Sequence, residues 1–324
     1  MRPLILKGHE RPLTMLKYNS EGDLLFSTAK DSTPTVWWTS NGERIGTYRG
    51  HSGAVWAIDV NKDSTRVVTG SADNSAKLWK AETGECLLTW VHKSPVRCVC
   101  FSSDDRLVFV ATSMLMGQSS EIYQYRVDTE SSEEASVPIR TLSGHSATVT
   151  RVLCHPNGAS LISTGEDGTV RKWDIETGRN TETVTVHQKP VNDLQLSKSG
   201  GQLITASSDF SAKILDFRSL KVLKTFLTDR PVNSAAISPI LPHVLLGGGQ
   251  EASQVTTTGD RAGRFEARLF HLIYEEEIGI IRGHFGPINT VAFSPDGRQF
   301  ASGAEEGFIR LHNFDEDYFQ ASYN

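Results

Sequence analysis

Residues 50–79, GHSGAVWAIDVNKDSTRVVTGSADNSAKLW, carry a histidine, an aspartate and a tryptophan whose spacing recurs along the chain. His51 precedes Asp73 by 22 residues, and Trp79 follows after 6 more. The same spacing returns, complete or in part, at His9, Asp31 and Trp37, at His145, Asp167 and Trp173, at His187 and Asp209, and at His284 and Glu306. Weaker copies begin at His92 and Thr228, so the chain holds seven units.

The length of the unit predicts the fold. A period of about 40 to 45 residues with a Gly-His opening and a Trp-Asp closing is typical of WD40 repeats, each of which forms one four-stranded blade. The β-branched run Val67-Val68-Thr69 and the turn residues Asp73-Asn74 favour short strands joined by tight turns. We therefore predict an all-β fold, a seven-bladed WD40 β-propeller.

The two ends of the chain complement each other. Leu4-Ile5-Leu6 precede the first Gly-His, while the seventh unit stops after its third strand, near Asn313-Phe314. Pairing the N-terminal strand in the last blade closes the ring and removes open sheet edges, which are prone to aggregation. We predict one propeller domain over residues 1–324, with a short C-terminal tail at 315–324.

A hydrogen-bond network explains the spacing. In a WD40 blade the histidine precedes the innermost strand, the aspartate lies in the turn between the second and third strands, and the tryptophan is on the third. Ser71, two residues before Asp73, is expected to link them, so we predict a structural network of His51, Ser71, Asp73 and Trp79. Only the second unit is then complete. Because this trio recurs and decays, it indicates a scaffold and not a hydrolase.

Composition narrows the classes of function. The 33 basic and 38 acidic residues show no clustered basic face, which argues against direct nucleic-acid binding. The four cysteines have neither a disulfide framework nor metal-ligand spacing, so we expect reduced thiols, no metal and no cofactor. Since no apolar stretch approaches the roughly 20 residues of a membrane span, we expect a cytoplasmic protein without membrane contact.

Two insertions interrupt the period. The polar stretch Asp128 to Ser136 in the third unit is predicted to be an exposed, flexible loop. The sixth unit holds extra residues between Gln250 and Phe270, which we expect to form a projecting recognition loop. Gly247-Gly248-Gly249 precedes it but leads from strand to strand, so a phosphate-binding loop is not predicted.

Several segments go beyond the general repeat pattern, among them Lys7 to Thr14, Asn41 to Arg44, Arg230 to Ala236, Leu246 to Ala252, Phe265 to Arg268 and Gly283 to Asn289. These segments resemble subunit i of eukaryotic translation initiation factor 3. The likeness spans the chain and is weakest from about Cys98 to Ser160. It is most specific in the sixth unit, which departs from the general WD40 pattern.

The resemblance implies a non-enzymatic scaffold subunit without catalytic residues. Such a subunit binds subunits b and g, contacts the small ribosomal subunit indirectly, and supports recruitment of initiator tRNA and mRNA and scanning. The resemblance places a helical segment of subunit b beside blades five and six, where Ile214 would offer apolar contact and Asp216 a carboxylate. Equally, Ile214 fits a core position and Asp216 an ordinary Trp-Asp position. The alternative function is a WD40 signalling adaptor for receptor or kinase complexes.

Overall fold

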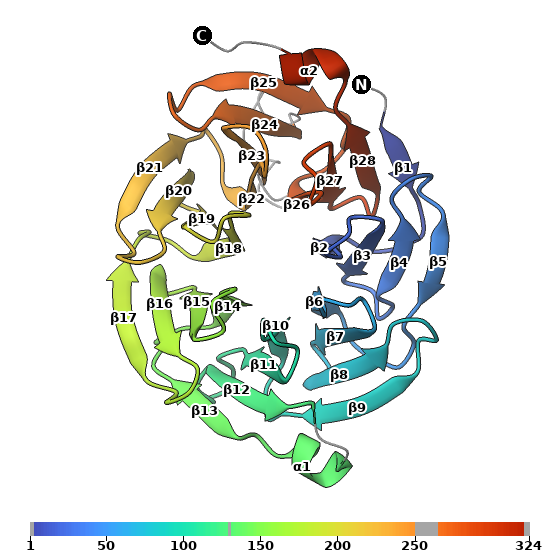
Figure 1. The fold of residues 1–324 in the computed structure, drawn as a ribbon, viewed down its shortest axis with the longest axis vertical. Helices are drawn as coiled ribbons and strands as arrows, with labels where there is room; N and C mark the ends of the chain where they lie inside the picture. Colours follow the sequence, from blue (N-terminus) through green and yellow to red (C-terminus); the bar gives the residue numbers. More distant parts are fainter. Residues whose placement is uncertain (1–2, 129–130, 250–264, 321–324) are drawn as a thin grey trace.

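The chain forms a ring of seven antiparallel sheets of four strands each (Figure 1). The structure is a computed structural model that describes residues 3–128, 131–249 and 265–320. Nearly all regular structure in these ranges is strand, and the sheets radiate from a common axis. The predicted all-β, seven-bladed propeller is confirmed.

Each blade runs outward from the axis. Blades one to three comprise β2 (Leu13–Tyr18), β3 (Leu24–Ala29), β4 (Thr35–Trp38) and β5 (Arg44–Thr47); β6 (Val55–Val60), β7 (Arg66–Ser71), β8 (Ser75–Lys80) and β9 (Cys86–Val91); and β10 (Val96–Phe101), β11 (Leu107–Thr112), β12 (Glu121–Arg126) and β13 (Arg140–Ser143). Blades four and five comprise β14 (Val149–Cys154), β15 (Ser160–Gly165), β16 (Thr169–Asp174) and β17 (Asn180–Thr185); and β18 (Val191–Leu196), β19 (Gln202–Ser207), β20 (Ser211–Asp216) and β21 (Val222–Leu227). Blade six comprises β22 (Val232–Ile237), β23 (His243–Gly248), β24 (Glu266–His271) and β25 (Glu277–Arg282).

The seventh blade joins the two ends of the chain. It combines β26 (Ile288–Phe293), β27 (Gln299–Ala304) and β28 (Ile309–Asn313) with β1 (Leu4–Leu6) as its outermost strand. Leu4 pairs with Leu311 and Leu6 with Ile309 in an antiparallel register. Unfolding the ring therefore requires separating strands from opposite ends of the sequence.

Burial within a blade follows strand position. Five of the six residues of β7 are buried, whereas most of the outermost strand β9 is accessible to water. The core lies between neighbouring blades: Phe26 and Tyr48 of blade one pack with Ile58 and Trp79 of blade two. These interblade layers hold the inner strands at fixed spacing around the axis.

In the described ranges, two short helices lie at the rim. In the stretch predicted to be a flexible loop, α1 (Ser132–Ser136) buries Ala135 and receives a 2.7 Å hydrogen bond on its carbonyl from the Trp90 indole. The structure therefore differs from the predicted loop in forming a short helix there, anchored by Ala135 and the Trp90 indole, while Glu133 and Glu134 are exposed as predicted. Residues 129–130 of the same stretch lie outside the described residues. The insertion predicted to project from blade six lies outside the described residues from 250 to 264.

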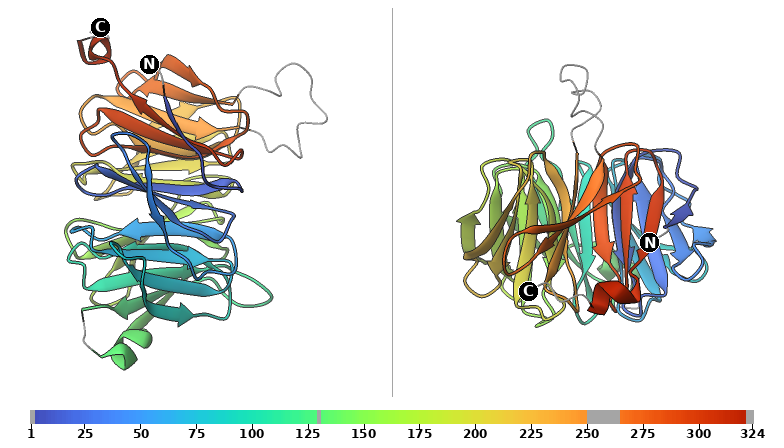
Figure 2. Two further views of the ribbon diagram at one scale, coloured as in Figure 1. Left: turned by 90° about the vertical axis from the view of Figure 1, so that its right-hand side faces the viewer. Right: turned by 90° about the horizontal axis from the view of Figure 1, so that it is seen from above.

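The C-terminal segment also packs against the ring. The predicted tail contains α2 (Glu316–Gln320), whose Tyr318 stacks on Phe314 with ring centroids 3.9 Å apart and bonds the His243 imidazole at 2.6 Å. Phe319 joins the same apolar cluster. Figure 2 shows α2 at the rim near the start of the chain.

Candidate functional site

The recurrent histidine, aspartate and tryptophan form a directional hydrogen-bond chain inside blade two. The His51 Nδ1 atom lies 2.9 Å from the Asp73 carboxylate, and its Nε2 atom lies 2.7 Å from the Thr69 hydroxyl. The Trp79 indole donates to the same hydroxyl at 2.8 Å. Since the ionised carboxylate accepts at Nδ1–H, Nε2 must accept from Thr69. These hydrogen bonds connect the loop before β6, the turn between β7 and β8, and the strands β7 and β8.

The hydroxyl at the centre of the chain is Thr69 and not Ser71, so that part of the predicted network is wrong. Ser71 is buried, but its oxygen accepts a bond from the Asp73 backbone N–H at 3.2 Å and contacts neither ring. Residues two apart in the extended strand β7 share a face. Of Thr69 and Ser71, Thr69 is the one that lies within hydrogen-bond distance of both the His51 and the Trp79 rings. A hydroxyl residue 18 positions after the histidine was a usable signal in the sequence.

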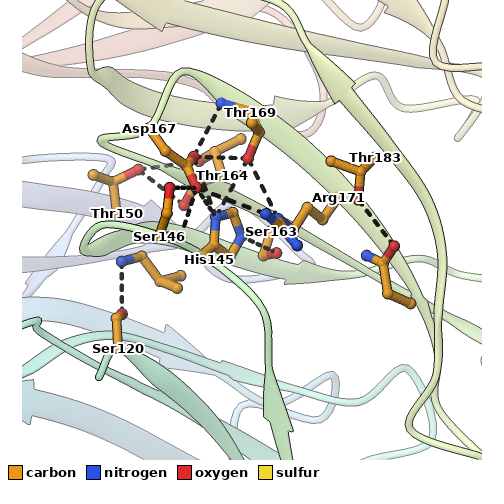
Figure 3. Close-up of polar contacts among 12 residues, drawn as sticks. Ser120, His145, Ser146, Thr150, Ser163, Thr164, Asp167, Thr169, Arg171 and Thr183 are labelled. Carbon is orange, nitrogen blue, oxygen red and sulfur yellow. Dashed lines mark hydrogen bonds and ion pairs between the residues drawn. The ribbon is translucent and has the colours of Figure 1, made fainter. Parts of the chain in front are cut away.

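With this hydroxyl assigned, the network is complete in three blades and not in blade two alone. In blade four, His145 lies between Asp167 and Ser163 (Figure 3), at 3.0 and 2.8 Å. Blade one has the same arrangement. Blade five lacks the indole, and blade seven has Glu306 for the aspartate and His312 for the tryptophan. The central hydroxyls in blades one, four, five and seven are Ser27, Ser163, Thr205 and Ser302.

In blades two and five, burial favours a neutral imidazole beside the carboxylate. Burial lowers the pKa of His51 and His187 and outweighs the aspartates that oppose it. Burial would raise the pKa of Asp73, but hydrogen bonds from Ser75, the Ser52 backbone and His51 together lower it to about 2. The neutral imidazole and the ionised carboxylate can therefore act as a stable hydrogen-bond donor and acceptor within the blade.

Replacing Thr69 by valine is expected to destabilise the fold by about 2 to 4 kcal/mol, because it leaves the Trp79 N–H and the His51 Nε2 atom buried without partners. Ser71→Ala removes one acceptor from a backbone N–H and should cost about 1 kcal/mol. Equilibrium urea unfolding of both variants measures the difference. An equal or greater loss for Ser71→Ala would contradict the assignment of Thr69.

The two residues predicted to bind a partner separate in the structure. Ile214 on β20 is fully buried and packs with Phe226, Val244 and Phe270 between blades five and six. It cannot offer apolar contact at the surface, so this prediction is wrong. The reason is that residues of blade six cover Ile214 on the face of β20 where it lies.

Asp216 ends the same strand and faces a surface turn. One carboxylate oxygen accepts from the Ser219 backbone N–H at 2.8 Å and from its hydroxyl at 2.7 Å. These hydrogen bonds, the side-chain one first, lower the pKa of Asp216. The Arg218 backbone N–H and the Arg218 charge lower this pKa further, so the carboxylate is available in its ionised form to a partner.

Exposed apolar residues lie beside Asp216. Leu215 pairs with Val222 across β20 and β21, and both Val222 and Leu223 are more than two-fifths exposed. The next blade contributes Ile273 and Tyr274, since Lys224 of β21 bonds the Ile273 carbonyl at 2.9 Å. We call Asp216, Val222, Leu223, Ile273 and Tyr274 the blade-five edge. It combines a carboxylate with an apolar strip of a kind that suits a protein partner.

The described part of the chain also bears on a metal site, a reactive thiol and a membrane-spanning helix. Its histidines, cysteines and carboxylates include no group of three placed to hold a metal ion. Cys98 and Cys100 are buried in β10, and burial raises the pKa of both thiols. None of the helices in the described ranges is long and apolar enough to cross a membrane.

Comparison with known proteins gives a consistent result. A family model described as EIF3I matches residues 1–324. A curated protein of Nematostella vectensis named "Eukaryotic translation initiation factor 3 subunit I" is 49% identical over 318 residues, covering 98% of this chain and 98% of that protein. Proteins of the same name from Bombyx mori and Drosophila melanogaster are 46% identical over 327 residues and 48% identical over 322 residues, with at least 99% of each chain covered.

Proposed function

The chain belongs to the eukaryotic translation initiation factor 3 subunit I family, and we propose that it is a non-enzymatic scaffold that holds subunits b and g in that factor. In this role it supports recruitment of initiator tRNA and mRNA to the small ribosomal subunit, and scanning, in the cytoplasm. The observation that carries the proposal is likeness to these relatives over essentially the whole length of both chains. Its ribosome contact would be indirect, through other subunits.

The blade-five edge is the surface that we assign to subunit b. A helix of that subunit could lay apolar side chains on Val222 and Leu223 while a lysine or arginine reaches the ionised carboxylate of Asp216. Such a pair is shielded from water on the side of the apolar strip, which strengthens it. Ile214 supports the edge from inside but makes no contact in this arrangement.

Charge reversal tests the assignment. Asp216→Lys is expected to weaken binding of recombinant subunit b about thirtyfold or more, because it replaces the attraction with a like-charge contact. Its matched control is Asp174→Lys in blade four, since Asp174 also accepts from a turn residue, the Thr177 N–H at 2.7 Å and hydroxyl at 2.6 Å. Isothermal titration calorimetry measures both, with thermal unfolding as a check of the fold.

A second pair of variants separates the apolar contact from the charge. Leu223 on β21 and Leu87 on β9 occupy the same place in their blades and are 47% and 42% exposed. Leu223→Asp should reduce binding and Leu87→Asp should not. Equal effects, or none, would move the subunit b site elsewhere. Absence of subunits b and g among proteins that co-purify with the wild type, with receptors or kinases in their place, would refute the function itself.

A further inference from the structure

Every blade carries a β-bulge at the second residue of its innermost strand. In β6, for example, Val55 pairs with Ser71 and Ala57 with Gly70, so Trp56 is the extra residue. A bulge turns one side chain away from the regular alternation, and bulges are frequent next to functional sites. We call the seven extra residues the bulge ring: Thr14, Trp56, Arg97, Thr150, Asn192, Asn233 and Asn289.

All seven side chains of the bulge ring line one pocket of about 520 Å³. The pocket lies where the innermost strands begin, around the axis seen in Figure 1. Each of the seven innermost strands therefore contributes one bulge-ring side chain to this central pocket. The outer strand β21, which carries part of the blade-five edge, lies at the rim of the ring and away from the axis.

Most polar members of the bulge ring are occupied in joining neighbouring blades. Each of four donates to the carbonyl of the first residue in the next blade's innermost strand, which satisfies that carbonyl and locks the ring. The four donors are Thr14 to Val55 at 2.6 Å, Asn192 to Val232 at 2.9 Å, Asn233 to Ile288 at 3.1 Å and Asn289 to Leu13 at 3.0 Å. Thr150 instead bonds Thr164 in its own blade.

Trp56 and Arg97 break this pattern. The Arg97 guanidinium lies over the Trp56 ring, 4.2 Å from its centroid, and this cation–π contact holds it at the pocket wall. Among the described residues, neither side chain has a hydrogen bond or an ion pair, so the guanidinium donors and the indole N–H remain open to a ligand. Tryptophan and arginine are the residues that most often carry the binding energy of protein interfaces.

The surrounding charges select the ligand. Among the charged residues that line the pocket, Arg151 is paired with Asp193 at 2.9 Å and Lys30 with Glu305 at 3.4 Å, which leaves Arg97 and Glu166. A phosphate with about two negative charges would be repelled by Glu166 and would have one unpaired guanidinium to hold it. A single carboxylate fits better, since a planar guanidinium binds it through two parallel hydrogen bonds and Glu166 can accept a donor from a flanking residue.

We propose that the bulge ring is a second docking site, which binds a peptide segment of a partner protein through one Asp or Glu on Arg97 and one apolar side chain against Trp56. The site uses the inner strands of blades two and three and does not depend on the blade-five edge. It gives the scaffold a second attachment on a different surface of the disc.

Selection of random heptapeptides displayed on phage tests this proposal with the intact protein as bait. The wild type is expected to enrich peptides with one Asp or Glu next to an apolar residue. A synthetic copy of the most enriched peptide should bind Arg97→Gln about thirtyfold or more weakly than the wild type. Lys172→Ala is the matched control, because Lys172 also lies over an aromatic ring, that of Phe217 at 4.3 Å, but outside the pocket.

Further variants keep the result interpretable if Arg97→Gln is unstable. Trp56→Phe retains a ring under the guanidinium and should keep the preference for a carboxylate, whereas Arg97→Glu should reverse it toward basic peptides. The proposal fails if no acidic position is enriched, if Arg97→Gln binds like the wild type, or if inorganic phosphate displaces the peptide at equal concentration. Loss of binding in Asp216→Lys instead would assign the peptide to the blade-five edge.

Discussion

Replacing Gly168 by alanine is expected to destabilise the fold by about 3 to 5 kcal/mol. This residue, in the turn before β16, has φ +74, and a Cβ atom built there would lie 2.2 Å from the backbone carbonyl oxygen of His187. The Gly168 carbonyl also accepts from the Val186 and His187 N–H groups, so the turn is fixed against the link between blades four and five. Neither backbone segment can withdraw without losing these hydrogen bonds.

Gly84→Ala isolates the contribution of the close contact. Gly84, between β8 and β9, has φ +72, but a Cβ atom there would meet its nearest neighbour, the Thr47 carbonyl oxygen, at an ordinary 3.4 Å. Only the cost of the left-handed backbone remains, about 1 to 2 kcal/mol. Urea unfolding of both variants gives the comparison. Losses equal within error would show that the blade four turn relaxes and that the close approach to His187 is not maintained.

Spacing along the chain was enough to predict the ring, since each unit buries its sheet faces against its neighbours and a seventh unit lacking one strand needs the N-terminal Leu4 to Leu6. The same spacing misassigned the central hydroxyl. Ser71 and Thr69 lie on the same face of one strand, and only their depth along β7 distinguishes them. Which of the two hydroxyls meets the imidazole depends on where the loop that carries His51 lies along β7. The number of residues between the recurring positions does not reveal this.

The site was harder to predict for a related reason. Ile214 and Asp216 lie two apart, so alternation places them on one side of β20, yet Ile214 is enclosed by blade six while Asp216 reaches the edge of the disc. Enclosure depends on where the neighbouring blade ends. The bulge ring gave no signal in one blade alone. It becomes visible when the second residue of all seven innermost strands is compared, because five are Thr or Asn and the other two are Trp56 and Arg97.

Acidification is expected to destabilise the ring well before its aspartates titrate. Burial lowers the pKa of His92, His243 and His312 from 6.5 to about 4. His312 takes the tryptophan place of blade seven and stacks on Phe300 with ring centroids 4.5 Å apart. In the unfolded chain each histidine binds a proton near pH 6.5, whereas in the fold each stays neutral until about pH 4.

The sign follows from proton linkage. Between pH 6.5 and 4 the unfolded state binds more protons than the folded state. The contribution of each neutral histidine to the free energy of unfolding is therefore complete above pH 6.5, and it decreases by up to about 1.4 kcal/mol for each pH unit as the pH falls through this range. Urea unfolding at pH 7.5 and pH 5 measures the slope. His92→Phe and His312→Phe keep the ring contacts with Tyr123 and Phe300 but cannot titrate, so the double variant should lose clearly less stability on acidification.

The same measurement separates the isolated histidines from those of the hydrogen-bonded chains. Asp73, with its pKa lowered to about 2, contributes stability that is present above about pH 4 and is lost as the pH falls toward 2. Its loss therefore begins where that of His92 and His312 ends. A double variant as sensitive as the wild type between pH 6.5 and 4 would show that His92 and His312 do not carry the acid response. The response would then be assigned to the other histidines whose pKa values burial lowers, His243, His51 and His187.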